Sequence, residues 1–381
     1  MKLLSIEPTP SPNTMKLNVD VRLDPGVQLN YGGKDATTTS PPPLIARLLE
    51  VPGVKAIFHT SDFLALDRKG NADWATILEG VKTAFGVAAG SGSIASTVPE
   101  AESFGESHVR VQMFRGIPMQ IRVRSGGQEF RAAMPERFTH AVSEAAGSTM
   151  IRERMLEDLG VRYGDSQDVL DEVQRELEAA YSEARLRDLI EQAKAAGPEG
   201  APPAPPAPLT GAEVMQALDS QDWRERFAAL ERLKPKAEDL PVLDKALTDS
   251  QMSVRRLAVV YLGDLRTPES MPLLFAALKD SSGSVRRTAG DTLSDIGDVA
   301  AIGPMIEALE DSNKLVRWRA ARFLYEAGDE TALDALRKSA ASESEFEVKL
   351  QSEMAVARIE RGEEAAGSVW QQMTRMREQS E

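Results

Sequence analysis

The sequence predicts a multidomain protein that combines α+β and all-α architecture: two small α+β domains followed by a C-terminal α-solenoid of about five 31-residue repeats. The first observation is a period. The dipeptide Val-Arg recurs at Val254-Arg255, Val285-Arg286 and Val316-Arg317, in steps of 31 residues. The second is compositional, because two stretches rich in small residues or proline divide the chain into three parts. The third is an alternation of apolar and polar residues in the first two parts, which is typical of strands.

Several columns keep the 31-residue step, so the period does not depend on one dipeptide. Weaker copies flank the three good ones, with Trp223-Arg224 one period earlier and Val348-Lys349 one period plus a residue later. Such a period indicates units that stack, because each is too small to bury its apolar face alone. The other regular columns are Asp249, Asp280 and Asp311; Leu247, Leu278 and Leu309; Ala258, Ala289 and Ala320; and Leu262, Leu293 and Leu324.

Each period predicts a helical hairpin. In the central one, Pro272 to Lys279 forms the first helix, residues 280–284 the turn, and Val285 to Ile296 the second helix. Proline suits the start of a helix, where its missing N–H costs nothing. The pattern resembles short HEAT-like repeats over residues 210–362. That resemblance implies an extended surface for a protein partner, with the second helices lining the concave face.

Two columns at the start of the second helices receive different predictions. Arg255, Arg286 and Arg317 can reach the aspartate turn of their own or an adjacent repeat, so we interpret them as a ladder that fixes the stacking. The neighbouring column has no evident packing role and is the candidate partner-binding surface, with simple exposure to solvent as the alternative. The candidate residues are Arg256, Arg287, Trp318, Asp291 and Arg322.

Composition sets the domain boundaries. Residues 87–107 are small, Gly/Ser-rich and then acidic, which predicts a flexible linker. Residues 197–208 are rich in proline and alanine and favour an extended spacer. These linkers leave a first domain at 1–86, a middle domain at 108–196 and the repeat array at 209–381.

The first domain predicts a compact ββαββα unit. Strands are expected at 2–6, 15–23, 54–59 and 63–67, and helices at 44–50 and 74–85.

Particular motifs in this domain match a known family. Residues 9–16 read TPSPNTMK, 43–49 read PLIARLL and 51–58 read VPGVKAIF. With these motifs, residues 1–86 resemble the N-terminal domain of Nfu/NifU-type iron–sulfur scaffold proteins. That family places its cluster on a separate C-terminal domain with a CxxC pair, whereas this chain contains no cysteine. The resemblance therefore implies a shared fold and shared partners, among them iron–sulfur assembly proteins, without cluster ligation by thiolates.

The 9–16 motif has two interpretations. Its prolines and asparagine are the residues that build a tight turn, which gives it a structural role. The functional alternative is an exposed docking loop, with Thr9, Pro12, Asn13 and Lys16 as its candidate residues.

The middle domain predicts a second α+β unit. Alternation over residues 108–131 predicts two strands joined near residues 115–118. Helices are expected at 135–146, 149–159 and 166–195, the last capped by Ser166, and a short strand at 161–163.

One face of these strands is basic. Residues 108–137 hold six arginines against two glutamates. The face could therefore bind an anionic ligand or nucleic acid through Arg110, Arg122 and Arg124, although no aromatic residues interleave them. The alternative is that these arginines pair with acids of the following helix, namely Glu172, Glu176 or Glu178.

Three further segments extend the resemblance to the whole chain. They are MFRGIPM at 113–119, PERF at 135–138 and RYG at 162–164. Set between the Nfu-like start and the helical repeats, they resemble the conserved virulence factor C family of bacterial proteins. That resemblance implies a regulatory or accessory role.

The composition argues against several function classes. Without cysteine, the chain has no disulfide, thiolate metal site or cysteine nucleophile. Its three histidines are scattered, and it lacks GxSxG, P-loop and GxGxxG motifs. The net charge of −14 opposes general binding to nucleic acid or anionic membrane. We therefore expect no enzyme activity, no catalytic residue, no cofactor, no metal and no membrane segment, in a cytoplasmic protein.

The function predicted from the sequence is a non-enzymatic scaffold, adaptor or regulatory protein that binds a protein partner through the HEAT-like array. Two alternatives stay open. One is an accessory role in iron–sulfur cluster assembly through the Nfu-like domain. The other is an anionic-ligand or nucleic-acid binder that acts through the basic strands.

Overall fold

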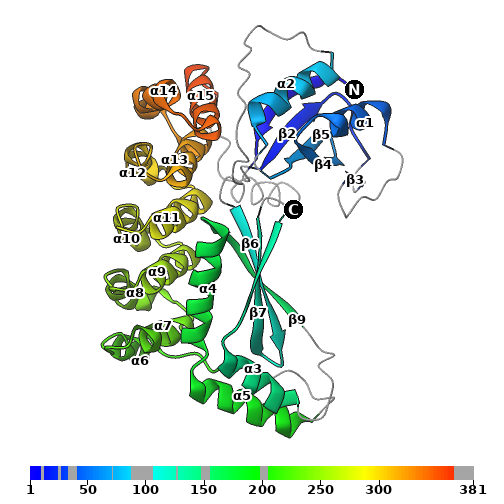
Figure 1. Cartoon of the computed structure of the whole chain (residues 1–381). Helices are drawn as coiled ribbons and strands as arrows, with labels where there is room; N and C mark the ends of the chain where they lie inside the picture. The colour runs from blue at the N-terminus through cyan, green and yellow to red at the C-terminus, as the bar shows by residue number, and fades with distance from the viewer. Residues whose placement is uncertain are drawn as a thin grey trace. The chain divides into compact units, whose positions relative to one another are not determined.

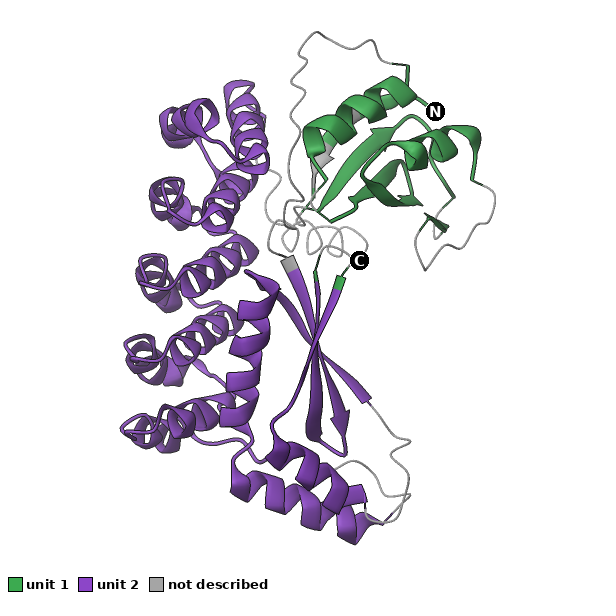
Figure 2. Ribbon diagram, in the orientation of Figure 1, with its two compact units in different colours: residues 1–106, 125–128 green, residues 107–124, 129–381 purple. Residues whose placement is uncertain are grey.

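The computed structural model describes residues 1–9, 13–24, 27–32, 41–70, 72–86, 106–125, 128–146, 155–197 and 205–363. The chain divides into two compact units, shown in Figure 2. Unit 1 contains residues 1–106 and 125–128, and unit 2 contains 107–124 and 129–381. The predicted middle domain and repeat array thus share one unit. Most of both predicted linkers lies outside the described residues.

Unit 1 is built on an antiparallel five-stranded sheet with strand order β1-β2-β5-β4-β3. Alternation along the central strands sends Leu17 and Leu64, which are register partners, to the buried face. The strands are β1 (Leu3–Pro8), β2 (Thr14–Val19), β3 (Gln28–Tyr31), β4 (Val54–Thr60) and β5 (Phe63–Arg68), and the helices are α1 (Pro43–Glu50) and α2 (Trp74–Ala84).

The predicted ββαββα order is confirmed except that it omits β3. This edge strand is only four residues long, QLNY, and is too short to show a clear alternation. It pairs with β4, with Leu29 opposite His59 and Tyr31 opposite Ile57.

Unit 2 begins with a four-stranded sheet in the order β8-β7-β6-β9. The strands are β6 (Glu106–Phe114), β7 (Ile117–Ser125), β8 (Gln128–Ala133) and β9 (Met155–Tyr163). Arg115 and Gly116 join β6 to β7, and both have positive φ angles, of 47° and 75°. Two such residues form the tight turn whose twist suits a hairpin.

Residues 155–159, expected to be helical, belong to strand β9; residues 149–154 of that predicted helix lie outside the described part. Met155, Leu156 and Leu159 have the spacing of a helix face, but this segment is the edge strand beside β6. Pairing with a distant strand outweighs the local pattern here.

The predicted helix 166–195 is two helices, α4 (Ser166–Ala180) and α5 (Glu183–Ala196), which follow α3 (Glu136–Ala146). Tyr181 leaves the helical conformation, and the side chain of Ser182 accepts a hydrogen bond from the amide of Arg185 to cap α5. The N-cap of α4 is Asp165, one residue before the predicted Ser166. The break falls in the uncharged segment 179–182, where Ser182 is a capping residue that the prediction overlooked.

The described part of residues 209–381 forms five helical hairpins, as predicted. In Figure 1 the first helix of each hairpin lies in an outer row and the second in an inner row, beside α4. The hairpins are α6 (Gly211–Ala217) with α7 (Trp223–Glu231), α8 (Leu240–Leu247) with α9 (Met252–Leu265), α10 (Met271–Ala277) with α11 (Gly283–Ile296), α12 (Ile302–Ala308) with α13 (Lys314–Ala327), and α14 (Leu333–Ser342) with α15 (Phe346–Glu360).

The arginine ladder is confirmed. Arg255 forms two hydrogen bonds, of 2.7 and 2.9 Å, with the carboxylate of Asp280 in the next repeat. It also donates to the carbonyl of Asp249 in its own repeat, at 2.9 Å. Each such arginine therefore ties two turns together. Equivalent pairs are Arg226 with Asp249, Arg286 with Asp311, and Arg317 with Glu343.

Candidate functional site

The column predicted to bind a partner is largely buried. Arg256, Arg287, Trp318 and Arg322 are between 2% and 8% exposed, while Asp291 is partly exposed. The expectation that packing makes no use of this column is therefore wrong. Its side chains are engaged within unit 2, and two of them, Arg256 and Arg287, contact the middle region.

Arg256 of α9 lies against two carboxylates of α4. Its Nη2 donates to Glu176 Oε1 at 2.8 Å, and its Nε lies 2.9 Å from Glu172 Oε1. Arg162, at the end of β9, contacts the same two carboxylates at 3.0 and 2.9 Å. Two cations and two anions thus alternate in one buried cluster, which we call the clamp: Arg162, Glu172, Glu176 and Arg256.

The electrostatics of the clamp follow from its burial. Burial by itself raises the pKa of Glu176, but the charges of Arg256 and then Arg162 outweigh it and hold the pKa below its ordinary value. A buried pair of this kind is costly to break from one side, because the remaining charge has no partner. The clamp therefore favours one position of α4 relative to the array.

Arg287 of α11 makes the second contact with the middle region. Its guanidinium lies 4.0 Å from the ring centroid of Tyr163 and 5.5 Å from that of Trp318. It donates to the carbonyl of Leu315 at 2.7 Å and pairs with Asp291 at 3.0 Å. Burial lowers the pKa of Arg287, while Asp291 opposes this shift.

The other two candidates serve the array itself. Asp291 also pairs with Arg319 of the next repeat, at 2.6 Å. Arg322 donates to Glu326 on its own helix at 2.7 Å. The Asp291–Arg319 pair therefore joins the neighbouring second helices α11 and α13, whereas the Arg322–Glu326 pair lies within α13.

A continuous apolar core accompanies the charged contacts. Val169 and Val173 of α4 belong to the same buried cluster as Leu230 and Val259 of the second helices. The sequence did not identify Arg162, Tyr163, Glu172 and Glu176 as contacts of the array. Glu172 and Glu176 stand four residues apart on one helix face, but no local pattern points to an arginine 80 residues later.

The arginines of the basic strands, Arg110, Arg122 and Arg124, are at least partly exposed. Arg110 is about half exposed and contacts Asp158 of β9 at 3.5 Å. Arg122 donates to the amide oxygens of Gln120 and Gln112, and Arg124 is exposed. The alternative pairing with Glu172, Glu176 or Glu178 is wrong for these arginines, since the first two acids belong to the clamp and Glu178 accepts from Gln174.

The described residues of the candidate docking loop form contacts within unit 1. The Asn13 side chain accepts from Arg68 Nε at 3.1 Å, and Thr9 Oγ1 donates to the carbonyl of Thr14 at 2.9 Å. Lys16 lies over the ring of Phe63, 5.0 Å from its centroid. Pro12 lies outside the described residues.

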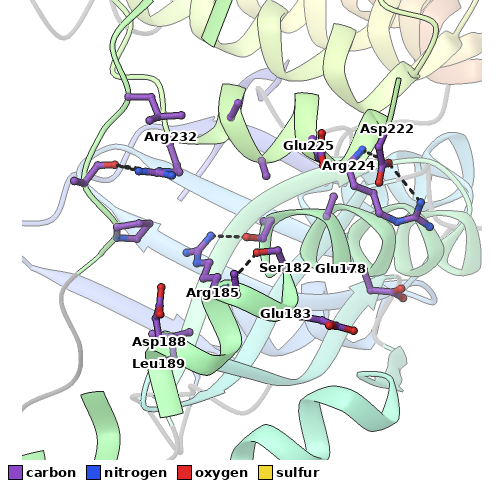
Figure 3. Close-up of a pocket in the computed structure, with 18 of the residues that line it drawn as sticks. Glu178, Ser182, Glu183, Arg185, Asp188, Leu189, Asp222, Arg224, Glu225 and Arg232 are labelled. Atoms are coloured by element: carbon purple, nitrogen blue, oxygen red, sulfur yellow. Dashed lines mark hydrogen bonds and ion pairs between the residues drawn. The ribbon is translucent and has the colours of Figure 1, made fainter. Parts of the chain in front are cut away.

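A cavity of about 980 Å³ lies between the start of α5 and helix α7 (Figure 3). Charged side chains surround it, but two of its arginines, Arg185 and Arg232, donate to backbone carbonyls. Arg185 donates to the carbonyl of Ala180 at 2.8 Å, and Arg232 to that of Ala207, also at 2.8 Å. The side chain of Asp222 caps α7. These contacts brace the junction of α4, α5 and the first repeat.

Chemistry-bearing groups are sparse in the described part of the chain. No group of three or more histidine, aspartate or glutamate side chains there could hold a metal ion. None of the helices described is long and apolar enough to cross a bilayer.

Three family models match consecutive parts of the chain. "Scaffold protein Nfu/NifU N terminal" matches residues 4–91, "Virulence factor" matches 112–190, and "HEAT repeats" matches 211–289 and 271–357. The solved structure of protein SAV1430 from Staphylococcus aureus is 36% identical to this chain, covering 22% of it and 99% of SAV1430, with a TM-score of 0.20.

Full-length relatives share this order of parts. YpgR of Bacillus subtilis (strain 168) is 54% identical over 100% of both chains. A protein of Staphylococcus aureus (strain NCTC 8325 / PS 47) named Conserved virulence factor C is 46% identical, covering 98% of this chain and 99% of its own. The chain therefore belongs to the conserved virulence factor C family.

Proposed function

We propose that the protein is a non-enzymatic scaffold that binds a protein partner at the C-terminal end of the inner row of its HEAT array. HEAT repeats form extended surfaces of the kind that hold other proteins. In this chain, the inner row in the second and third repeats already holds the middle region through Arg256 and Arg287. The partner surface therefore has to lie farther along.

The observation that supports this proposal is that the side chains at equivalent positions of the inner row change from charged to apolar toward the last repeat. Each second helix after the first has a buried valine near its start: Val254, Val285, Val316 and Val348. Two residues after it come Arg256, Arg287, Trp318 and Leu350, and six residues after it come Val260, Asp291, Arg322 and Met354. The row is charged and internally paired in the middle of the array. In the last repeat it presents Leu350 and Met354, which are partly exposed.

Two neighbouring, partly exposed apolar side chains on the last second helix suit the apolar face of a partner helix or loop. Burying them contributes to binding roughly in proportion to the apolar area removed from water. The name of the Staphylococcus aureus relative connects the family with virulence, and a scaffold in a regulatory assembly is consistent with that name. The absence of cysteine fits a reducing compartment such as the cytoplasm.

Affinity purification of the tagged full chain from cells, after crosslinking, tests the proposal. The double variant Leu350→Glu/Met354→Glu should lose the partner recovered with the wild type, because two carboxylates would have to be desolvated in the interface. The control Gln216→Glu adds charge to an exposed position on α6 of the first repeat and should retain it. Equal recovery with all three proteins would rule out this surface.

A second candidate function rests on unit 1. The match to the Nfu/NifU N-terminal model supports a role beside iron–sulfur scaffold proteins, and without cysteine that role is carried by the fold and its contacts. Deleting the protein should then depress the activity of iron–sulfur enzymes in the cell. Normal activities in the deletion strain would contradict this role.

A further inference from the structure

The open face of the second sheet carries a group of arginines that the clamp does not use. Along β6 and β7, Val109, Val111, Ile121 and Val123 are buried. Residues of opposite parity, among them Arg110, Arg122 and Arg124, lie on the other face. Arg131 of the neighbouring strand β8 is also exposed. Four arginines from three adjacent strands are thereby gathered on one side of the sheet.

Arg122 is oriented by neutral groups. Its Nε donates to Gln120 Oε1 at 3.2 Å and its Nη2 to Gln112 Oε1 at 3.0 Å. Gln112 is itself only 7% exposed, so the amide that holds the guanidinium is part of the packed sheet. Amide oxygens fix the orientation of the guanidinium without cancelling its charge. Its remaining N–H groups can bind an anion at little further cost in side-chain entropy.

The described carboxylates of this face do not neutralise it. Asp158 contacts Arg110 at 3.5 Å, and Glu129 contacts Arg131 at 2.5 Å. Four arginines against these two carboxylates leave a local excess of two positive charges, on a chain whose net charge is −14. The pKa of Glu129 is lowered first by its hydrogen bond from Arg131, and then by the charges of Arg131, Arg122 and Arg124.

Arg122, which is held by amide oxygens, contrasts with the arginines of the ladder and of the clamp. Those of the ladder and of the clamp each contact a carboxylate within 3.0 Å. On the open face, neighbouring strands are about 4.8 Å apart and alternate residues of one strand about 6.7 Å apart. A flat row of cations at this spacing suits a polymer with one charge per unit, because counterion release from several contacts adds up. A small anion would make too few contacts there.

We propose that this face, centred on Arg122 and Arg124, binds the phosphate backbone of a single-stranded nucleic acid without sequence preference. No aromatic side chain is needed, since the contacts are to phosphates. The net negative charge of the chain weakens binding, which places the expected Kd in the micromolar range at about 50 mM salt.

Fluorescence anisotropy with the full chain and a labelled 20-nucleotide oligouridylate tests the proposal. Arg122→Gln/Arg124→Gln should weaken binding at least tenfold and reduce the slope of log K against log salt by about 1.4, since each phosphate contact on a single strand contributes about 0.7. The control Arg175→Gln/Arg187→Gln removes the same charge from exposed positions on α4 and α5 and should change affinity less than twofold. Circular dichroism verifies that both variants are folded.

Three results would overturn the proposal. The first is no binding at 50 mM salt, and the second is equal loss of affinity in both double variants. The third is binding of a 20-residue polyglutamate as tight as that of the oligonucleotide, with the same dependence on Arg122 and Arg124. That third result would assign the face to an acidic protein segment instead.

Discussion

Arg286 of α11 forms a bidentate ion pair with the carboxylate of Asp311, which lies 25 residues later in the turn of the next repeat. Nε and Nη2 bind the two carboxylate oxygens at 2.6 and 2.8 Å. The same guanidinium donates from Nη1 to the carbonyl of Asp280 in its own turn, at 2.8 Å. One side chain thus contacts the turns of two adjacent repeats and fixes the offset between them. Because this contact recurs in successive repeats, the Val-Arg dipeptide recurs at a regular spacing in the sequence.

The first prediction concerns this ladder. A double-mutant cycle of Arg286→Ala and Asp311→Ala should show a coupling energy of about 1–3 kcal/mol in urea unfolding, because the pair is bidentate and mostly buried. The pair Lys279 and Glu307 also joins two repeats but is about two-thirds exposed. It should couple much more weakly. Similar coupling in the two cycles would show that the ladder is not a specific stacking device.

The second prediction concerns acid. The folded-state pKa of Glu176 lies below its ordinary value near 4.5, so the clamp stabilises the fold above that pH. That stability is lost as the pH falls from about 4.5 through the lower, folded-state pKa. In Glu176→Gln, the contribution is missing at every pH.

Thermal unfolding between pH 7 and pH 3 measures this effect. The difference in Tm between the wild type and Glu176→Gln should be largest at neutral pH and should shrink as the pH falls below 4.5. Glu353→Gln, at an exposed position on α15, serves as the control and should track the wild type. A difference that stays constant down to pH 3 would contradict the lowered pKa.

The third prediction concerns the motif at residues 9–16. Asn13→Ala removes the acceptor of Arg68 Nε, and Arg68 is only 4% exposed. The loss should cost about 1–3 kcal/mol, the range for a buried donor left without a partner. Hydrogen–deuterium exchange in β2 and β5 of the full chain should accelerate accordingly. Lys16→Ala, which removes the contact over the partly exposed Phe63 ring, should have a smaller effect; the reverse order would favour a different role for Asn13.

Most of the fold could be predicted because its signals are local or periodic. The Val-Arg step reports five stacked hairpins, and alternation reports β1, β2, β4 and β5 of the first sheet and β6 and β7 of the second, but not β3 or β8. Where prediction failed, a distant partner determined the structure. Residues 155–159 have the apolar spacing of a helix and pair with β6 as a strand. The break at Tyr181 is a different case, because the uncharged residues 179–182 and the capping Ser182 mark it locally and the prediction overlooked them.

The site was predicted only in part. The column beginning with Arg256 was identified because its residues break the regularity of the repeat, and the structure places it in contacts within unit 2. Its occupants, α4 and the end of β9, lie some 80 to 120 residues earlier in the chain. A single sequence shows that a surface differs from its neighbours, but it does not show which segment covers it.

The central claim is that the inner row of the array holds the chain's own middle region through Arg256 and Glu176. A double-mutant cycle of Arg256→Met and Glu176→Gln, measured by urea unfolding of the full chain at pH 7, tests it most directly. The account predicts a coupling energy of about 2 kcal/mol or more, since both groups are buried and 2.8 Å apart. Additive effects, with a coupling below about 0.5 kcal/mol, would contradict it.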